Sequence, residues 1–243
     1  MLKVLCDGCL FGARHGTGRP RVLALHGWGR SHRDFDGVLD GLDALAVDLP
    51  GFGASPPPPA AWGSEEYAAC VACVLDELES PAVVVGHSFG GGVSVHLAAA
   101  SPGRVGALVL TGVPRLCAGD GRRPAPALAY RIGRALHRRR LLGDERMEAL
   151  RRRYGSVDYA TAIGVMRQVH VRAVNEDHEA VLGRLACPVE LVWGEDDTAA
   201  PVGVARCAAK RIADARLTTL TGAGHMTPLT AAGDIRAAIE RHL

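Results

Sequence analysis

The 243-residue sequence lacks most of the features that mark membrane, secreted or cofactor-dependent proteins. No stretch approaches the roughly 18 unbroken apolar residues of a membrane-spanning helix, so none is expected. The first ten residues contain Lys3 and Asp7 with no long apolar run after them, so no signal peptide is expected and a cytoplasmic location is the default. Phosphate-binding glycine loops and Asp, Glu and His clusters at metal-ligand spacing are not apparent, so we expect neither a metal nor an organic cofactor.

Cysteine is present in an odd number, seven, with scattered spacing that does not suggest a disulfide framework. Cys6 and Cys9 are separated by two residues, as are Cys70 and Cys73, which leaves a four-thiolate zinc site as an alternative. Cys70 and Cys73 fall in a helix-compatible run where small residues are expected to be buried. We therefore interpret them as free thiols that pack as small hydrophobic side chains.

Six short apolar runs alternate with helix-compatible stretches along the chain. Each run is expected to be a buried strand, and such alternation predicts an α/β fold with a mostly parallel, doubly wound sheet and helices on both faces. The segment before Val22 is expected to add an antiparallel hairpin at one edge. The expected strands are 22–25, 44–49, 82–85, 105–110, 189–193 and 216–220, and the expected helices between and after them are 34–42, 64–78, 89–100, 202–212 and 231–243.

One interval, residues 114–184, breaks this alternation because it contains no convincing strand. Residues 128–142 and 147–153 have helical patterns, and a structureless loop of this length would be unusual. We therefore predict a helical cap inserted into a single catalytic domain whose core comprises residues 1–113 and 185–243.

The third apolar run leads into Gly86-His87-Ser88-Phe89-Gly90, a Gly-x-Ser-x-Gly sequence between an expected strand and an expected helix. The chain must reverse there within a few residues, and glycines two positions from the serine avoid collisions in so sharp a turn. Ser88 is thereby predicted to be a nucleophile at the carboxyl edge of the sheet. The alternative is a glycine-rich turn that contains serine by coincidence.

A serine hydroxyl needs a base, and the base needs a carboxylate to orient it. His225 follows the last expected strand, so it should reach the same sheet edge as Ser88. The sequence Gly194-Glu195-Asp196-Asp197 follows the fifth expected strand and offers three carboxylates. The backbone N–H of Phe89, the residue after the nucleophile, is expected to donate to an oxyanion.

The order serine, acid, histidine resembles that of the α/β-hydrolase superfamily over nearly the whole chain. In such proteins the acid commonly lies three residues after a glycine and four before a proline. This position is occupied by Asp197, with Asp196 as the alternative. The resemblance also implies that the loop His26-Gly27-Trp28-Gly29 supplies a second oxyanion donor, the N–H of Trp28, and that Trp28 and Phe89 contact the substrate.

These residues predict a serine hydrolase that cleaves a carboxylic ester through an acyl-enzyme on Ser88. A serine argues against the epoxide and halide chemistry of relatives that have an aspartate nucleophile. Thioesterase, lactonase and C–C bond hydrolase activities use the same residues and stay open, as does a non-catalytic ligand-binding member of the fold. The loops at Trp28 and at 48–53 are similar to those of small pimeloyl-carrier methyl ester esterases, and Asp48 itself is interpreted as structural.

The expected partner is a small acyl substrate, either free or linked to a carrier. Eleven arginines lie between Arg122 and Arg153, whereas the chain has only two lysines. We interpret these arginines as a solvated face, with an anionic partner as the alternative, and no nucleic-acid partner is expected because no binding motif accompanies them. The oligomeric state is left open. Six apolar side chains of the insertion either line an acyl channel or pack it onto the sheet: Leu136, Leu141, Leu142, Ile163, Val165 and Met166.

Overall fold

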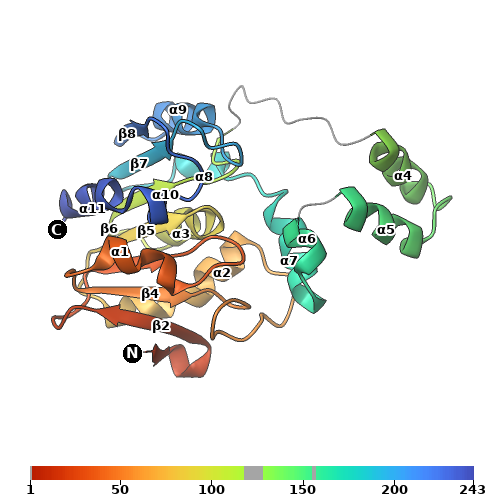
Figure 1. Cartoon of the computed structure of the whole chain (residues 1–243). Coiled ribbons are helices and arrows are strands. Elements are labelled where there is room, and N and C mark those ends of the chain that lie inside the picture. The colour runs from red at the N-terminus through yellow and green to blue at the C-terminus, as the bar shows by residue number, and fades with distance from the viewer. Residues whose placement is uncertain (1, 118–127, 155–156) are drawn as a thin grey trace.

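The computed structural model describes residues 2–117, 128–154 and 157–243, and its centre is an eight-stranded sheet (Figure 1). The strand order is β1-β2-β4-β3-β5-β6-β7-β8, with β3 to β8 parallel and β1 and β2 antiparallel at one edge. The mostly parallel α/β sheet and its edge hairpin are therefore confirmed. The strands are β1 (Leu2–Leu5), β2 (Leu10–His15), β3 (Val22–Leu25), β4 (Ala44–Asp48), β5 (Ala82–His87), β6 (Val105–Thr111), β7 (Val189–Gly194) and β8 (Ala215–Leu220).

Helices cover both faces of the sheet because successive strand residues point to opposite sides. Val22 and Ala24 of β3 pack in the cluster that contains Ile235 of α11. Leu23 and Leu25 pack in the larger cluster on the other face. The covering elements are η2 (His32–Phe35), α1 (Asp36–Leu39), α10 (Thr227–Thr230) and α11 (Ala232–Glu240) on the first side, with α2 (Ser64–Val71), η3 (Ala72–Glu77), α3 (Phe89–Ala100) and α9 (Val202–Arg211) on the second.

Between β6 and β7 the described residues form helices and no strand, as predicted. They are α4 (Leu128–Arg138), α5 (Asp144–Tyr154), α6 (Val157–Thr161), α7 (Gly164–Ala173) and α8 (Glu179–Leu182). Helices α4 and α5 form a hairpin that lies beside the body of the molecule (Figure 1). Glu148 of α5 holds it to the next helices, because it accepts hydrogen bonds from Tyr159 Oη at 2.6 Å and Arg167 Nη1 at 3.0 Å.

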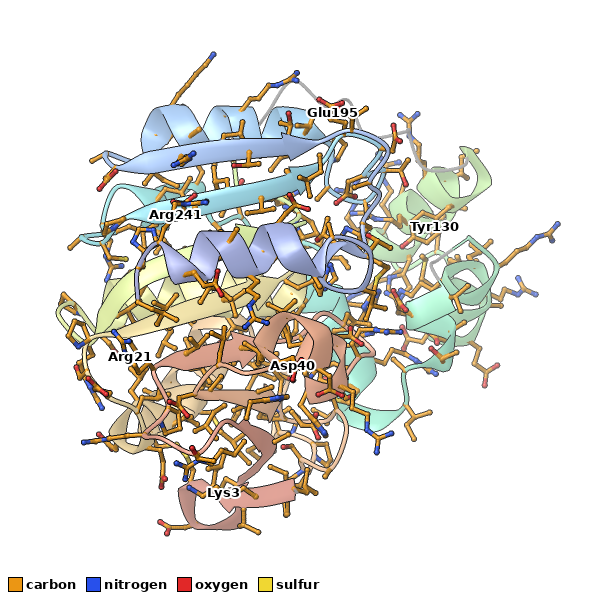
Figure 2. The ribbon with its side chains drawn as sticks, turned by 60° about the vertical axis from the view of Figure 1, so that its left-hand side comes forward. Lys3, Arg21, Asp40, Tyr130, Glu195 and Arg241 are labelled. Atoms are coloured by element: carbon orange, nitrogen blue, oxygen red, sulfur yellow. A yellow bond between two sulfur atoms is a disulfide. The ribbon has the colours of Figure 1, made fainter. Side chains whose placement is uncertain are left out.

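These helices lie at one end of the parallel strands. In Figure 2, Arg21 at the amino end of β3 and Tyr130 on α4 lie on opposite sides of the molecule. The insertion therefore lies at the carboxyl ends of the parallel strands, where α/β sheets bind ligands. Parts of the predicted insertion, including Arg122 and Arg123, lie outside the described residues, and its boundaries stay a prediction. In the part of the chain that is described, no helix has the length and apolar character needed to cross a membrane.

Four of the seven cysteines form disulfides, which corrects the expectation of free thiols. Cys6 in the β1–β2 loop is bonded to Cys73 in η3, and Cys117 after β6 is bonded to Cys207 in α9. Their Cα–Cα distances are 6.0 Å and 5.8 Å. The expectation failed because each pair is brought together by the packing of segments 67 and 90 residues apart. The spacing of cysteines along the sequence does not indicate which distant segments pack against each other.

Candidate active site

Ser88 occupies the sharp turn between β5 and α3, with φ of 52° and ψ of −117°. A positive φ is strained for a residue with a side chain, and such strain is typical of functional turns. The turn is held by the bond from Ser88 N to Thr111 O at 2.9 Å. A Cβ at Gly90 would overlap the main-chain carbonyl of Leu25 in the adjacent strand, so the motif glycine is required by packing.

Three of the residues predicted from the sequence lie in one hydrogen-bonded line. His225 Nε2 lies 3.1 Å from Ser88 Oγ, and His225 Nδ1 lies 2.8 Å from Asp197 Oδ2. The other carboxylate oxygen of buried Asp197 accepts from the main-chain N–H groups of Ala199 at 2.9 Å and Ala200 at 2.8 Å. The carboxylate is thereby fixed to face the imidazole. Asp196, the alternative acid, is exposed and does not take part in this line.

His87, the residue before Ser88, connects β5 to the loop that carries His225. Its Nε2 lies 2.9 Å from the main-chain oxygen of His225, and since a carbonyl only accepts, this nitrogen donates. Burial, followed by the nearby His225 ring, lowers the pKa of His87 to about 4, so the ring is neutral near pH 7. The sequence marks His87 only as a member of the Gly-x-Ser-x-Gly motif and predicts no contact for it.

The loop after β3 lies against the Ser88 turn. The main-chain oxygen of His26 accepts from Gly90 N at 3.1 Å, and His26 Nε2 accepts from Leu49 N at 3.0 Å. A Cβ at Gly27 would come within 2.9 Å of His87 Nδ1, so only glycine fits there without a shift. The loop is thus held close to the turn, and Trp28 lines the same cavity as Ser88.

Asp48 organises the second loop of this edge. Its buried carboxylate accepts from His32 N at 2.7 Å, His32 Nδ1 at 2.9 Å and Ala54 N at 2.9 Å. Burial alone would raise the pKa of Asp48, but these donors outweigh burial and lower it. The contacts join the 48–55 turn to η2, which fits the structural interpretation made from the sequence.

A cavity of about 320 Å³ opens on Ser88 and His225. None of the six apolar side chains of the insertion lines this cavity, so they do not form an acyl channel at Ser88. Val165 and Met166 pack against the core instead, as the packing alternative predicts. Leu136 near the end of α4, Leu141 between α4 and α5, and Ile163 between α6 and α7 are exposed. The residues that line the cavity are Trp28, Ser64, Ser88, Phe89, Pro114, Asp158, His170, Ala173, Val174, His178, Ala199 and His225.

Trp28 separates this cavity from a smaller one of about 210 Å³ that Ile163 and Met166 help to line. Its ring centroid lies 4.9 Å from that of Phe52 and 5.6 Å from that of Phe89. The aromatic contacts fix the indole at the wall of both cavities. Trp28 and Phe89, expected from the sequence to contact substrate, thus both lie beside Ser88.

Sequence reasoning missed the polar side chains of this cavity. His170 of α7 is buried, and its ring centroid lies 4.7 Å from that of Trp28. Burial lowers the pKa of His170. His178, before α8, and Ser64, at the start of α2, are also buried. No motif marks these three residues, because they meet through the packing of distant helices. Within residues 2–117, 128–154 and 157–243, no group of three or more metal-ligating side chains is placed to hold an ion.

Comparisons with known proteins agree with the fold described above. The sequence profile of the alpha/beta hydrolase family matches residues 22–238. The pimeloyl-[acyl-carrier protein] methyl ester esterase of Chromobacterium violaceum is 30% identical over 92% of this chain and 94% of its own length. The dihydrolipoyllysine-residue acetyltransferase component of the acetoin cleaving system of Cupriavidus necator is 32% identical over 95% of this chain and 65% of its own length.

Among solved structures, a thermophilic esterase from Thermogutta terrifontis has a TM-score of 0.67 and 22% identity. The match covers 99% of this chain and 96% of the esterase. At this identity the likeness concerns the fold alone.

Proposed function

Because the chain belongs to the alpha/beta hydrolase family and is an esterase-type hydrolase, we propose that it cleaves carboxylic esters through an acyl-enzyme on Ser88. The observation that carries the proposal is the line from Ser88 through His225 to Asp197, with distances of 3.1 Å and 2.8 Å. Such a line can remove the hydroxyl proton and stabilise the positive charge that results.

In the first half of the reaction, His225 Nε2 takes the proton of Ser88 Oγ, and Oγ forms a bond to the ester carbonyl carbon. The carbonyl π electrons move to its oxygen, which becomes an oxyanion. Asp197 stabilises the imidazolium through Nδ1–H. His225 then gives its proton to the departing alkoxide, the carbon–oxygen bond breaks, and the alcohol leaves an acyl group on Ser88.

The oxyanion is proposed to accept hydrogen bonds from the main-chain N–H groups of Phe89 and Trp28. Loss of one such donor typically raises the barrier by about 3–4 kcal/mol. Phe89 is the first residue of α3, so the positive end of the helix faces the same charge. The contact of Gly90 N with His26 O supports this role, because it holds the Trp28 loop beside the turn.

In the second half of the reaction, water replaces the alcohol. His225 takes one proton of the water as its oxygen bonds to the acyl carbon, and a second oxyanion forms in the same place. When this intermediate collapses, the Ser88–carbon bond breaks and Oγ regains the proton from His225. The products are a carboxylic acid and free enzyme, and none of these steps requires a metal or an organic cofactor.

Residues 114–184 are proposed to act as a cap that selects the substrate, since His170 and Val174 from this interval line the cavity at Ser88.

A carrier-linked ester is the second candidate substrate. Residues 128–154, named here the Arg-rich hairpin, contain nine arginines and only three acidic residues. Such a surface fits an acidic carrier, and the relative from Chromobacterium violaceum is named for a carrier-linked ester.

The proposed cytoplasmic location is weakened by one observation. The bonds Cys6–Cys73 and Cys117–Cys207 are of a kind that persists in oxidising compartments and is rare in the cytosol. The location can be tested by alkylating free thiols during lysis of the native host and counting the alkylated cysteines by mass. Seven alkylated cysteines fit a reducing compartment, and three fit an oxidising one.

The experiment that tests the function is hydrolysis of p-nitrophenyl butyrate by the native chain and by His225→Ala. We expect turnover that the variant loses. A panel of methyl esters, thioesters, lactones and β-diketones at equal concentration then separates esterase activity from the other acyl-bond reactions. Absence of turnover on the whole panel would contradict the proposal and favour a ligand-binding role.

A further inference from the structure

Two polar side chains, Ser64 and His178, converge at one end of the cavity that opens on Ser88. Both are buried, with exposed fractions of 1% for Ser64 and 5% for His178. A Cβ built on Gly92 would lie 2.8 Å from His178 Nε2 and 3.2 Å from Ser64 Oγ. Both polar atoms therefore lie close to Gly92, and the absence of a side chain there leaves space for a ligand group beside them.

This polar end lies close to the proposed nucleophile. Gly92 is four residues after Ser88 on α3, and its N–H donates to Ser88 O at 3.2 Å. One helical turn rises about 5.4 Å. A group bound by Ser64 and His178 is thus roughly four to five bonds along an extended chain from a carbonyl carbon at Ser88.

His178 offers this group a hydrogen bond without a charge. Burial, followed by the adjacent His96, lowers its pKa to about 4, whereas Glu176 and Asp177 act in the opposite direction. His178 Nδ1 lies 3.4 Å from His96 Nε2. His96 therefore contacts Nδ1 of the His178 ring, whereas Nε2 of the same ring faces Gly92.

Ser64 offers mainly an acceptor. Its hydroxyl donates to Glu176 Oε2 at 2.6 Å, and its main-chain N–H lies 2.9 Å and 3.0 Å from the two oxygens of the same carboxylate. The lone pairs of Ser64 Oγ are thus available to a ligand donor. A carboxylate ligand is disfavoured, because the neighbouring imidazole is neutral and the nearby carboxylate of Glu176 would repel it.

We propose that Ser64 and His178 form a subsite for an uncharged hydrogen-bonding group, a hydroxyl or a secondary amide, on the acyl part of the substrate. The group donates to Ser64 Oγ and pairs with His178 Nε2, which orients the acyl chain so that its carbonyl carbon meets Ser88. The inference rests on the proposed ester hydrolysis and names the substrate class that the same site prefers.

The experiment compares three methyl esters of similar length: methyl 4-acetamidobutanoate, methyl heptanoate and monomethyl adipate. The first has an amide at the predicted distance, the second is apolar, and the third has a carboxylate. We expect kcat/KM for the amide ester to exceed that for the heptanoate about tenfold, as for one or two added hydrogen bonds, and the adipate to be the poorest. Equal values for the amide and heptanoate esters, or a preference for adipate, would overturn the inference.

Variants attribute the preference to the two side chains. Ser64→Ala and His178→Leu should bring the ratio of the amide to the heptanoate toward one, whereas His178→Gln, which keeps a neutral polar group, should retain much of it. Ser101→Ala, beyond the carboxyl end of α3, is the matched control and should keep the native ratio. The ratio does not depend on the fraction of folded enzyme, so a merely structural role for Ser64 in fixing the start of α2 would leave it unchanged and contradict the inference.

The outcomes for the two proposals differ. Hydrolysis of all three esters without preference leaves the esterase proposal in place and refutes the subsite. Absence of hydrolysis of every ester, together with no turnover of p-nitrophenyl butyrate, refutes the proposed function, and the subsite inference falls with it.

Discussion

His87 Nε2 donates a hydrogen bond to the main-chain oxygen of His225 at 2.9 Å. The bond joins the residue before Ser88 to the loop that carries the proposed base, although the two residues are 138 positions apart. The two rings are also in contact, with centroids 4.9 Å apart. His87 therefore helps to set the position of His225 relative to Ser88, in addition to Asp197.

Replacement of His87 by leucine should lower kcat more than it raises KM, because the base is displaced while the cavity is kept. A displacement of the order of 1 Å costs roughly a hundredfold, so we expect a loss of ten- to a hundredfold on p-nitrophenyl butyrate. His87→Gln, whose amide can still donate, should recover part of kcat. A leucine variant with native kcat would show that the contact has no positioning role.

The two candidate acids predict different variants. Asp197→Asn should reduce kcat by about four orders of magnitude, because an amide in place of the carboxylate favours the wrong tautomer of His225. Asp196→Asn is the matched control and should stay within a few-fold of native, since its side chain is exposed. Steady-state rates on one aryl ester decide the matter, and the reverse order of effects would assign the acid to Asp196.

The six inner strands and the line Ser88, Asp197 and His225 were predictable because their signals are local. Apolar runs mark buried strands, and each reactive residue follows one of them at the same edge of the sheet. The contact between Ser64 and Glu176 was not predictable, since the two residues are 112 positions apart and neither belongs to a motif. The disulfide between Cys6 and Cys73 was not predictable for the same reason.

The bond between Cys117 and Cys207 should stabilise the fold, because it closes a long loop between the end of the β6 segment and α9. The double variant Cys117→Ser/Cys207→Ser is expected to lose about 2–4 kcal/mol of unfolding free energy in urea. Cys187→Ser, which removes a free thiol, is the control and should lose less. If the native protein and the double variant unfold at the same urea concentration without reductant, the bond contributes nothing.

Several buried histidines, His87 and His178 among them, make stability depend on pH. Burial lowers the pKa of His87 and of His178 to about 4 in the folded chain, against an ordinary 6.5. Between these values the unfolded chain binds more protons than the folded one, so stability is complete above pH 6.5 and decreases as the pH falls toward 4. Each unit of difference corresponds to about 1.4 kcal/mol.

Urea unfolding at pH 7.5, 6.0 and 5.0 should therefore show a falling midpoint. His178→Gln removes one of these titrations, so its midpoint should depend less steeply on pH than that of the native chain. A native midpoint that is constant or rises as the pH falls would mean that these rings are protonated in the folded protein.

The central claim is that Ser88 is an activated nucleophile, and covalent labelling measures this most directly. Native protein treated with a fluorophosphonate should gain one phosphonyl group by intact mass, and peptide mapping should place it on Ser88. Ser88→Ala should gain none, and His225→Ala should react far more slowly. Equal labelling of native protein and Ser88→Ala, or no labelling of the native chain, would contradict the account.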